Sequence, residues 1–267
     1  MPTIKQLIDL KNRAALITGG AGHIGSVLGE ALAECGCRVV LLDNNEKECL
    51  RKTQAIQKRY GVAVYPLVAD LSDEKKIRSV PSKIFRKFGR LDIVVNCAAL
   101  VGTSHLKGWS VPFLEQNADT WRKALEVNLT SVFVLTQACT KLLEKSGHGS
   151  IINIGSIYGI VGPDLSLYQG TTMGNPAAYA ASKGGLVQLT RWLSTVLAPK
   201  VRVNTISLGG VFRNQPESFV NRYQQRTPLK RMAHEEDFKG AVVYLASDLS
   251  SYVTGHNLVV DGGFSAW

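Results

Sequence analysis

A tyrosine and a lysine four residues apart form the pair in this sequence best suited to acid–base chemistry. Tyr179 and Lys183 lie in the segment AAYAASKGG, whose helical pattern predicts that both side chains project from one helix face. A phenol with a pKa of about 10 is a poor base at neutral pH, but a neighbouring ammonium favours the phenolate and lowers that pKa. Such a pair can take a proton from an alcohol while a hydride leaves its carbon, or give one to a ketone.

The spacing of this pair is common, and a helix-surface tyrosine beside a solvated lysine would produce it equally well. Two other tyrosines, Tyr158 and Tyr168, have glycine and threonine in place of lysine at the same offset. Asn175 and Pro176 precede the helix and are expected to form its cap and first turn. Tyr179 is therefore the one candidate acid–base tyrosine with this pattern among the three.

A glycine-rich loop within LITGGAGHIGSVLG, residues 16–29, is the second candidate for chemistry. Gly20, Gly22 and Gly25 spell G-x-G-x-x-G, whereas Gly19, Gly22 and Gly25 give a different spacing. An apolar run precedes the loop and a helical pattern follows it, so the N–H groups of the helix N-terminus could hold a pyrophosphate. The alternative is a glycine-rich turn with no ligand.

The residue that ends the next apolar run indicates which dinucleotide would fit. Asp43 stands where a carboxylate can bond the ribose 2′-OH of the adenosine. A carboxylate there would repel a 2′-phosphate, and the following Asn44 and Asn45 bring no arginine to neutralise one. NAD is therefore favoured over NADP as the cofactor.

Alternating apolar and amphipathic segments predict the elements that position these residues. Strands are expected at 14–18, 38–43, 62–68, 91–96, 150–155, 201–207 and 257–262. Helices are expected near 24–35, 45–60, 72–88, 118–144, 176–197 and 234–247. Strands rich in Val, Ile and Leu suit burial on both faces. The fold class is therefore α/β, a Rossmann-type doubly wound sheet of seven parallel strands with helices on both faces.

The chain shows no linker, composition break or internal repeat, so residues 1–267 are expected to form one domain. Three long connections, about 98–118, 156–175 and 209–232, are expected to contact the substrate, because long loops in a compact domain are usually functional. The first two follow strand ends, where open α/β sheets bind ligands.

Composition restricts the class of protein further. A hydrophobic content of 45% with 19% charged residues is typical of a soluble enzyme. No apolar run is long enough for a membrane span and no signal peptide is visible, so a cytoplasmic protein without a membrane partner is expected. The five cysteines have no metal-site or disulfide spacing, and no metal is predicted.

The net charge of +10 raises the question of an anionic partner. Most basic residues alternate with acidic ones on predicted helix faces, so nucleic acid is not expected. The window 212–231 differs, because it holds Arg213, Arg222, Arg226, Lys230 and Arg231 against Glu217 alone. Cations over an active-site mouth would suit a phosphorylated or carboxylated substrate, and a solvated basic helix face is the equal alternative.

The motifs together resemble the short-chain dehydrogenases/reductases, and the resemblance covers nearly the whole chain. The matching segments are TGGAGHIG (18–25), VADLS around Asp70, NCAA (96–99), VNLTS around Asn128, NIGS ending at Ser156, YAASK with Tyr179 and Lys183, and VTGHNLVVDGG (253–263). The loops and the C-terminal GGFSAW are also similar to oxidoreductases of bacterial surface-sugar pathways, including flagellin modification.

The resemblance implies a role for each matching residue. Tyr179 would be the general acid/base, Lys183 would lower its pKa and hold the nicotinamide ribose, Ser156 would bond the substrate oxygen, and Asn128 would position a water in the proton path. The remaining cofactor contacts implied are Thr18, Gly19, Gly22, His23, Ile24, Gly25, Asp43, Asp70, Leu71, Asn96, Ala98, Gly209 and Val211. A homo-oligomer, a tetramer or dimer, is also implied.

Four departures from the family pattern stand out. His23 replaces a usual glycine, and the spacing of Gly19, Gly22 and Gly25 looks like the epimerase and dehydratase branch. Cys97 and Ala99 alter the turn after the fourth strand. Leu208 and Arg213 stand where proline and threonine are common. The gap of 23 residues from Ser156 to Tyr179 is wider than usual, and the extra segment is expected to fold over the substrate.

The sequence therefore predicts an NAD(H)-dependent oxidoreductase acting on a secondary alcohol or ketone of a sugar, nucleotide-sugar or similar polar molecule. A sugar-nucleotide epimerase or dehydratase is the first alternative, although the chain is short for one. A non-enzymatic NAD-binding regulator is the second, and the intact Asn128, Ser156, Tyr179 and Lys183 argue against it.

Overall fold

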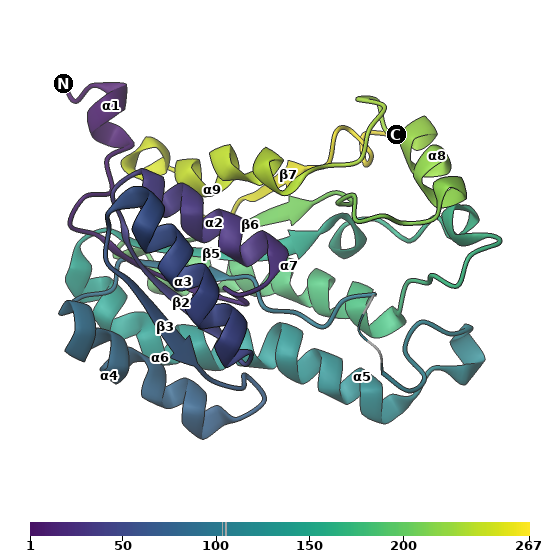
Figure 1. Ribbon diagram of the computed structural model, residues 1–267, viewed down its shortest axis with the longest axis horizontal. Helices are drawn as coiled ribbons and strands as arrows, with labels where there is room; N and C mark the ends of the chain where they lie inside the picture. The colour runs from purple at the N-terminus through teal and green to yellow at the C-terminus, as the bar shows by residue number, and fades with distance from the viewer. Residues whose placement is uncertain (103, 105) are drawn as a thin grey trace.

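Seven short runs rich in Val, Ile and Leu become the strands of one parallel sheet in the computed structural model, which describes residues 1–102, 104 and 106–267 (Figure 1). The strands are β1 (Ala14–Thr18), β2 (Arg38–Asp43), β3 (Val64–Val68), β4 (Ile93–Asn96), β5 (Gly149–Ser156), β6 (Val201–Leu208) and β7 (Asn257–Val260). Their spatial order is β3-β2-β1-β4-β5-β6-β7. The order reverses between β1 and β4, where sheets of this kind bind ligands. The predicted doubly wound fold is confirmed.

Helices cover both faces of the sheet. They are α1 (Ile4–Leu7), α2 (His23–Glu34), α3 (Glu46–Tyr60), α4 (Glu74–Phe88), α5 (Ala118–Leu125), α6 (Ser131–Ser146), α7 (Ala177–Leu197), α8 (Glu217–Arg226) and α9 (Lys239–Ala246). Side chains of α2, α3 and α9 form one hydrophobic core with the sheet, and those of α4, α6 and α7 form a second on the other face. Because all seven strands pair in one sheet, we propose that the chain forms a single domain.

Local residues explain where several elements begin and end. The Asn45 side chain accepts the N–H of Glu48 at the start of α3, and Gly61 ends that helix with a left-handed φ of 68°. Pro66 lies within β3, which tolerates it because β3 is an edge strand. These signals are local in the sequence, and the predicted strand and helix positions agree with the structure to within a few residues.

Three elements differ from the prediction. The expected helix 118–144 is interrupted by a π-helical turn, η2 (Glu126–Thr130), so α5 and α6 are separate. The expected helix 234–247 begins as a 3₁₀ turn, η5 (Glu235–Phe238), before α9. Helix α8 lies inside the predicted loop 209–232, and its burial of Phe219 and Tyr223 explains why it forms there.

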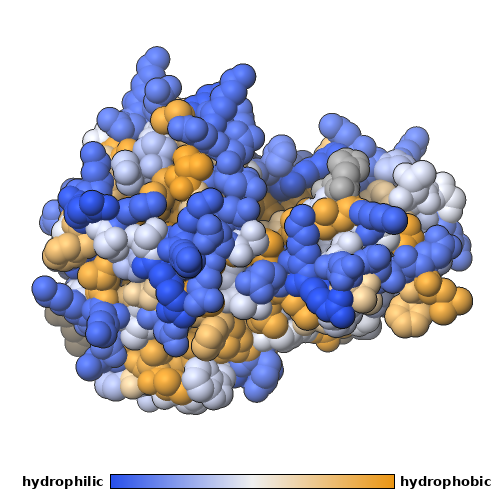
Figure 2. Space-filling view, turned by 90° about the horizontal axis from the view of Figure 1, so that it is seen from below, coloured by the Kyte–Doolittle hydropathy of each residue, from blue (hydrophilic) through white to orange (hydrophobic). Residues whose placement is uncertain are grey.

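The long connections gather with α8 at one end of the molecule, beside the C-terminus (Figure 1). Their described residues include the short 3₁₀ turns η1 (Phe113–Glu115), η3 (Ile157–Gly159) and η4 (Leu165–Tyr168). Positions 103 and 105 of the predicted loop 98–118 lie outside the described residues. The underside of the molecule, where α4, α5 and α6 lie, shows apolar patches between charged side chains (Figure 2). Within the described ranges, no helix combines the length and apolar character that a bilayer crossing needs.

Candidate active site

Strand register places two predicted residues, Thr18 and Asn96, side by side at the point where the strand order reverses. Thr18 of β1 pairs with Asn96 of β4, and Asn96 pairs with Asn153 of β5. The buried Thr18 Oγ1 accepts the N–H groups of Cys97 at 3.0 Å and Ala98 at 3.1 Å. The hydroxyl thus joins the turn after β4 to the end of β1, which fixes the floor of the predicted cofactor site.

The glycine loop forms a cradle that side chains would fill. Gly19 has a φ of 64°, and a Cβ there would lie 2.9 Å from the Cα of Ala98. A Cβ on Gly25 would lie 2.2 Å from the Gly19 carbonyl oxygen, and one on Gly20 would lie 2.8 Å from the Leu41 Cβ. Both spacings seen in the sequence are therefore used: Gly19 and Gly25 shape the turn, and Gly20 allows it to pack on β2.

The start of α2 offers free donors above this cradle. Its N-cap is Gly22, which provides no side-chain cap, and the first N–H bonded within the helix is that of Ser26. The N–H groups of His23, Ile24 and Gly25 lie in the first turn and have no intrahelical acceptor. Close backbone approach and exposed donors at a positive helix end fit a diphosphate.

Two carboxylates end the neighbouring strands β2 and β3. Asp43 is half-buried, and its oxygens accept the N–H of Ala21 at 3.0 Å and of Asn45 at 3.1 Å. The exposed Asp70 accepts the N–H and the hydroxyl of Ser72, and these bonds lower the pKa of its carboxyl. The glycine loop therefore holds Asp43 directly, and Asp70, with the buried Leu71 after it, lies two residues past the β3 strand that pairs with β2.

Tyr179 and Lys183 project from α7 toward the end of β5. The Lys183 Nζ donates to the carbonyl of Ile154 at 2.7 Å and lies 5.8 Å from the centre of the Tyr179 ring. Burial lowers the pKa of Lys183 to about 8. Burial also raises the pKa of Tyr179, and a hydrogen bond with Ser156 acts in the opposite direction. In the protein alone, burial thus outweighs the lowering of the tyrosine pKa that the sequence predicts from Lys183.

Ser156 is the last residue of β5 and is almost fully buried. Its Oγ accepts the N–H of Tyr158 at 3.2 Å, so the side chain caps the turn η3. A Cβ on Gly159 in that turn would lie 2.7 Å from the Lys183 carbonyl carbon. The missing side chain lets η3 pack directly on α7, which brings Ser156 to Tyr179.

Asn128 lies buried in the π-helical turn and connects two parts of the site. Its Oδ1 accepts the N–H of Leu100 at 2.7 Å, and its Nδ2 donates to the Leu100 carbonyl at 3.0 Å and to Ser182 Oγ at 3.1 Å. Ser182 in turn donates to the carbonyl of Tyr179. The Asn128 amide in the π turn thus bonds both the loop after β4 and helix α7, and π turns often occur at functional sites.

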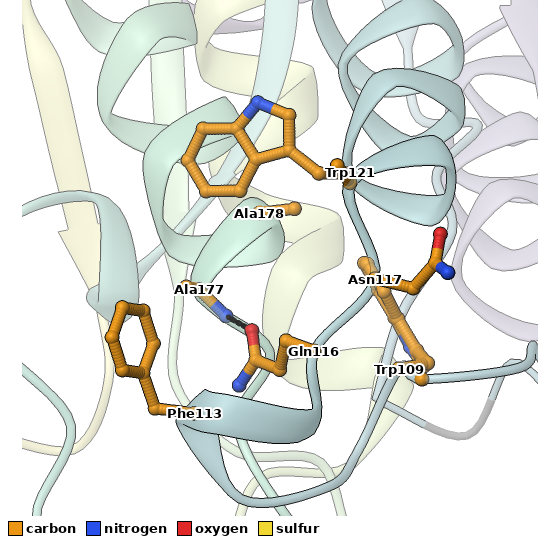
Figure 3. A pocket seen from close by; sticks show the side chains of 9 residues that line it. Trp109, Phe113, Gln116, Asn117, Trp121, Ala177 and Ala178 are labelled. Atoms are coloured by element: carbon orange, nitrogen blue, oxygen red, sulfur yellow. Dashed lines mark hydrogen bonds between the residues drawn. The ribbon is translucent and has the colours of Figure 1, made fainter.

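The first turn of α7 is capped from a distant loop rather than by its own flanking residues. Pro176 occupies the N-cap position without a side-chain cap, so the predicted capping role of Asn175 is wrong. The Gln116 Oε1 instead accepts the Ala177 N–H at 3.0 Å (Figure 3). Around this contact, Trp109, Phe113 and Trp121 line a pocket of about 370 Å³. Short-range sequence signals could not reveal a cap that comes from 61 residues away.

Two cations of the basic window hold the insertion that follows Ser156. The Arg222 guanidinium donates to the carbonyls of Ser166 at 3.1 Å and Gln169 at 2.6 Å. Arg226 Nε lies 3.8 Å from a carboxylate oxygen of Asp164. Helix α8 therefore binds the insertion through charged side chains.

The other three cations of the window also have partners within the chain. Arg213 pairs with Glu235 at 3.2 Å, Arg231 makes a two-pronged pair with Asp237 at 2.6 and 2.8 Å, and Lys230 donates to the Gln225 carbonyl. All five cations are thus engaged in structural contacts. Arg213, Arg226 and Arg231 face carboxylates, whereas Arg222 and Lys230 bond to neutral carbonyls and keep their positive charge.

The remaining predicted contacts lie where β6 ends. The Gly209 N–H donates to the Val260 carbonyl, and Val211 forms an isolated bridge with Ala233. The Tyr223 hydroxyl accepts the Gly210 N–H at 2.6 Å, which anchors this turn to α8. Within the described residues, no group of three or more His, Cys, Asp or Glu side chains is arranged to hold a metal ion.

Comparison with known proteins places this arrangement in a family. A family model described as enoyl-(acyl carrier protein) reductase matches residues 19–265, a span that holds the glycine loop, Asn128, Ser156, Tyr179 and Lys183. The chain belongs to the short-chain dehydrogenase/reductase family. Members of this family bind a nicotinamide cofactor, and the residues described above fit one.

Individual relatives span the whole chain. Post-translational flagellin modification protein A of Campylobacter coli is 29% identical over 96% of this chain and 99% of its own. A probable galactose dehydrogenase of Rhizobium meliloti is 31% identical over 97% of both chains. The structure of a gluconate 5-dehydrogenase from Burkholderia cenocepacia with NADP and tartrate has a TM-score of 0.88 at 28% identity, covering 99% of this chain and 100% of that one. The similarity to a flagellin modification protein agrees with the sequence prediction.

Proposed function

We propose that this short-chain dehydrogenase/reductase is an NAD(H)-dependent enzyme that interconverts a secondary alcohol and a ketone on a sugar or similar polar molecule. The observation that carries the proposal is the meeting of Ser156, Tyr179 and Lys183 at the strand ends beside the glycine cradle. An acid–base group, a hydrogen-bonding hydroxyl and a buried cation there suit proton exchange with a substrate oxygen.

Each side chain has a distinct part in this chemistry. Ser156 Oγ would bond the substrate oxygen, and the Tyr179 hydroxyl would give that oxygen a proton or take one from it. Lys183, held by the Ile154 carbonyl, places a positive charge beside the ring, which favours the phenolate when the proton leaves. Asn128 fixes the loop after β4 and, through Ser182, the turn that carries Tyr179, and it would position a water in the proton path.

A nicotinamide dinucleotide, when bound, supplies the hydride acceptor or donor. The free N–H groups at the start of α2 would hold its diphosphate, Asp43 its adenosine ribose, and Lys183 its second ribose. Thr18, Asn96 and Ala98 would form the floor, with Asp70 and Leu71 toward the adenine and Gly209 and Val211 at the nicotinamide end. NAD is preferred in this proposal because the Asp43 carboxylate, fixed by the Ala21 N–H, would meet a 2′-phosphate with like charge.

Two features support a polar, sugar-like substrate. The first is the name of the galactose dehydrogenase among the relatives. The second is the insertion after Ser156, which places polar side chains next to the candidate acid–base residue. A net oxidation or reduction distinguishes this function from an epimerase, which would recycle its cofactor.

The test is absorbance of the reduced nicotinamide with NAD or NADP across a panel of polyols, sugars and nucleotide-sugars. Wild type is compared with Tyr179→Phe and with Tyr252→Phe, a control that removes a hydroxyl from a fully exposed tyrosine. We expect turnover with NAD, a loss of about 100-fold or more in Tyr179→Phe, and no change in the control. Turnover that survives in Tyr179→Phe would exclude the proposed mechanism.

The proposal includes a homo-oligomer in the cytoplasm. Large apolar side chains are exposed on α6 and α7, with Phe133 at 42%, Trp192 at 54% and Val196 at 54% exposure. Exposed apolar surface of this kind is typical of contact sites between proteins. Light scattering coupled to gel filtration gives the mass, and the mass of a single chain would exclude the oligomer.

A further inference from the structure

The insertion after Ser156 is held as a packed wall beside the site. Tyr168 packs on Phe219 with ring centres 5.4 Å apart, and Phe219 lies 6.0 Å from Tyr223. Tyr223 stacks on Phe264 at 4.8 Å. Leu167 is buried in the same cluster, and Arg222 binds two carbonyls of the insertion. These contacts from α8 and the C-terminal segment fix where the side chains of the insertion lie.

Three polar side chains meet where the insertion begins and ends. Tyr158 follows Ser156 by two positions, Asn175 precedes Tyr179 by four, and Tyr168 lies on η4 between them. The hydroxyls of Tyr158 and Tyr168 are 2.7 Å apart and share a hydrogen bond. Burial raises the pKa of both phenols, and the neighbouring Asn175 amide lowers them by a smaller amount. Both phenols are therefore neutral at physiological pH.

This group adjoins the candidate acid–base residue. Burial is the main cause of the raised pKa of Tyr179 and Ser156 opposes it, but Tyr168 lies close enough to raise that pKa further. The backbone N–H of Tyr158 bonds Ser156 Oγ, which fixes the start of the insertion to that serine. The group thus adjoins Tyr179 and begins two residues after Ser156.

The hydrogen bonds within the group leave one donor and one acceptor over. Two phenols that share one hydrogen bond use one of their two O–H donors. The Asn175 Oδ1 is buried and has no partner in the part of the chain that the structure describes. Buried polar atoms without partners are costly, so a ligand that supplies a matching pair would be favoured. One alcohol group, which donates and accepts at once, supplies that pair.

We propose that Tyr158, Tyr168 and Asn175 form a hydroxyl-binding subsite that selects a neutral polyol or hydroxyketone with a free hydroxyl close to the reacting carbon. The inference rests on the proposed function and specifies its substrate class. The side chains of Tyr158, Tyr168 and Asn175 carry no charge. A carboxylate or phosphate would therefore find no counter-charge within the subsite itself.

The test compares kcat/KM for three substrates with NAD: butane-2,3-diol, butan-2-ol, which lacks the second hydroxyl, and lactate, which carries a carboxylate there. We expect wild type to prefer the diol at least tenfold over both. Tyr168→Phe keeps the ring that packs on Phe219 and should lower kcat/KM for the diol about tenfold, leaving butan-2-ol within twofold. Asn175→Ala should also lower the ratio of kcat/KM for the diol to kcat/KM for butan-2-ol. Tyr252→Phe should change kcat/KM for neither substrate.

Three outcomes would overturn the subsite. The first is an unchanged preference for the diol in both Tyr168→Phe and Asn175→Ala. The second is an equal fall of kcat/KM for the diol and for butan-2-ol in these variants. The third is a higher wild-type kcat/KM for lactate than for the diol. Failure of the proposed function gives a different result. Wild type would then reduce NAD with none of the three substrates, or Tyr179→Phe would oxidise butan-2-ol as fast as wild type. Thermal unfolding of each variant accompanies the kinetics, and a lowered diol value in a protein that unfolds at the wild-type temperature supports recognition.

Discussion

Replacing Gly25 by alanine should both destabilise the protein and weaken binding of NADH. The new Cβ would lie 2.2 Å from the Gly19 carbonyl oxygen and 2.8 Å from its carbon, whereas ordinary contacts begin at 3.4 Å. Both neighbours are backbone atoms, so relief requires the start of α2 or the turn at Gly19 to move. Overpacking of this kind costs about 1–3 kcal/mol. For a protein near this size, that cost lowers the unfolding temperature by roughly 2–12 °C.

The matched control is Gly240→Ala. Gly240 lies in α9, and an added Cβ would meet nothing within 4 Å. Alanine is the better helix former by up to about 1 kcal/mol, so this variant should be as stable as wild type or slightly more stable. It lies outside the cradle, and its affinity for NADH should be unchanged.

The assay combines thermal unfolding followed by circular dichroism with NADH titration followed by fluorescence. A displaced helix start misaligns the N–H groups that would hold the diphosphate, so the dissociation constant should rise about tenfold or more, since a factor of ten needs only about 1.4 kcal/mol. Wild-type affinity in Gly25→Ala would refute the role of the cradle in cofactor binding. A wild-type unfolding temperature would refute the packing argument itself.

Three further variants test other contacts. Asn128→Leu removes the hydrogen-bond partner of the Leu100 backbone and of Ser182. The free energy of unfolding, measured in urea, should fall by about 3 kcal/mol. A fall of less than about 1 kcal/mol would contradict the connecting role of Asn128. Burial lowers the pKa of Lys183 to about 8, from 10.5 in the unfolded chain. Burying the charged ammonium therefore reduces the folding stability in full below pH 8, and this loss of stability fades as the pH rises to 10.5. The stability of wild type relative to Lys183→Met, measured in urea, should therefore increase by about 3 kcal/mol across that window, and a constant difference would exclude the shift. Arg222→Ala should speed proteolytic cleavage in the insertion with little change in unfolding temperature, because Arg222 bonds two carbonyls of the insertion. Equal cleavage rates in the variant and in wild type would show that Arg222 does not hold the insertion.

The sheet was predictable because its signals are local. Apolar runs such as 38–43 and 201–207 are buried on both faces, and their composition suffices to identify parallel strands. Helix α8 was missed because its mostly polar sequence buries just Phe219 and Tyr223 among its ten residues. The π turn at Asn128 was missed because its sequence suits an α-helix, and tertiary contacts decide the difference.

Within the candidate site, residue types were predictable from the sequence but their partners were not. The positions of Ser156, Tyr179 and Lys183 follow from strand ends and helix spacing. The acceptor of Lys183, the Ile154 carbonyl, is a backbone atom that no motif marks. Burial raises the pKa of Tyr179, and the extent of burial is known only from the packed structure.

The insertion between Tyr158 and Asn175 meets the rest of the protein through side chains of α8 and the aromatic rings around Phe219. Strand β5, which precedes the insertion, is held by its pairing with β6. Helix α7, which follows it, is held by hydrogen bonds to Gln116 and Asn128. A segment attached in this way can lengthen, shorten or be exchanged during evolution while the reacting groups stay in register. Substrate range and reaction chemistry can therefore be inherited as separate traits in this chain.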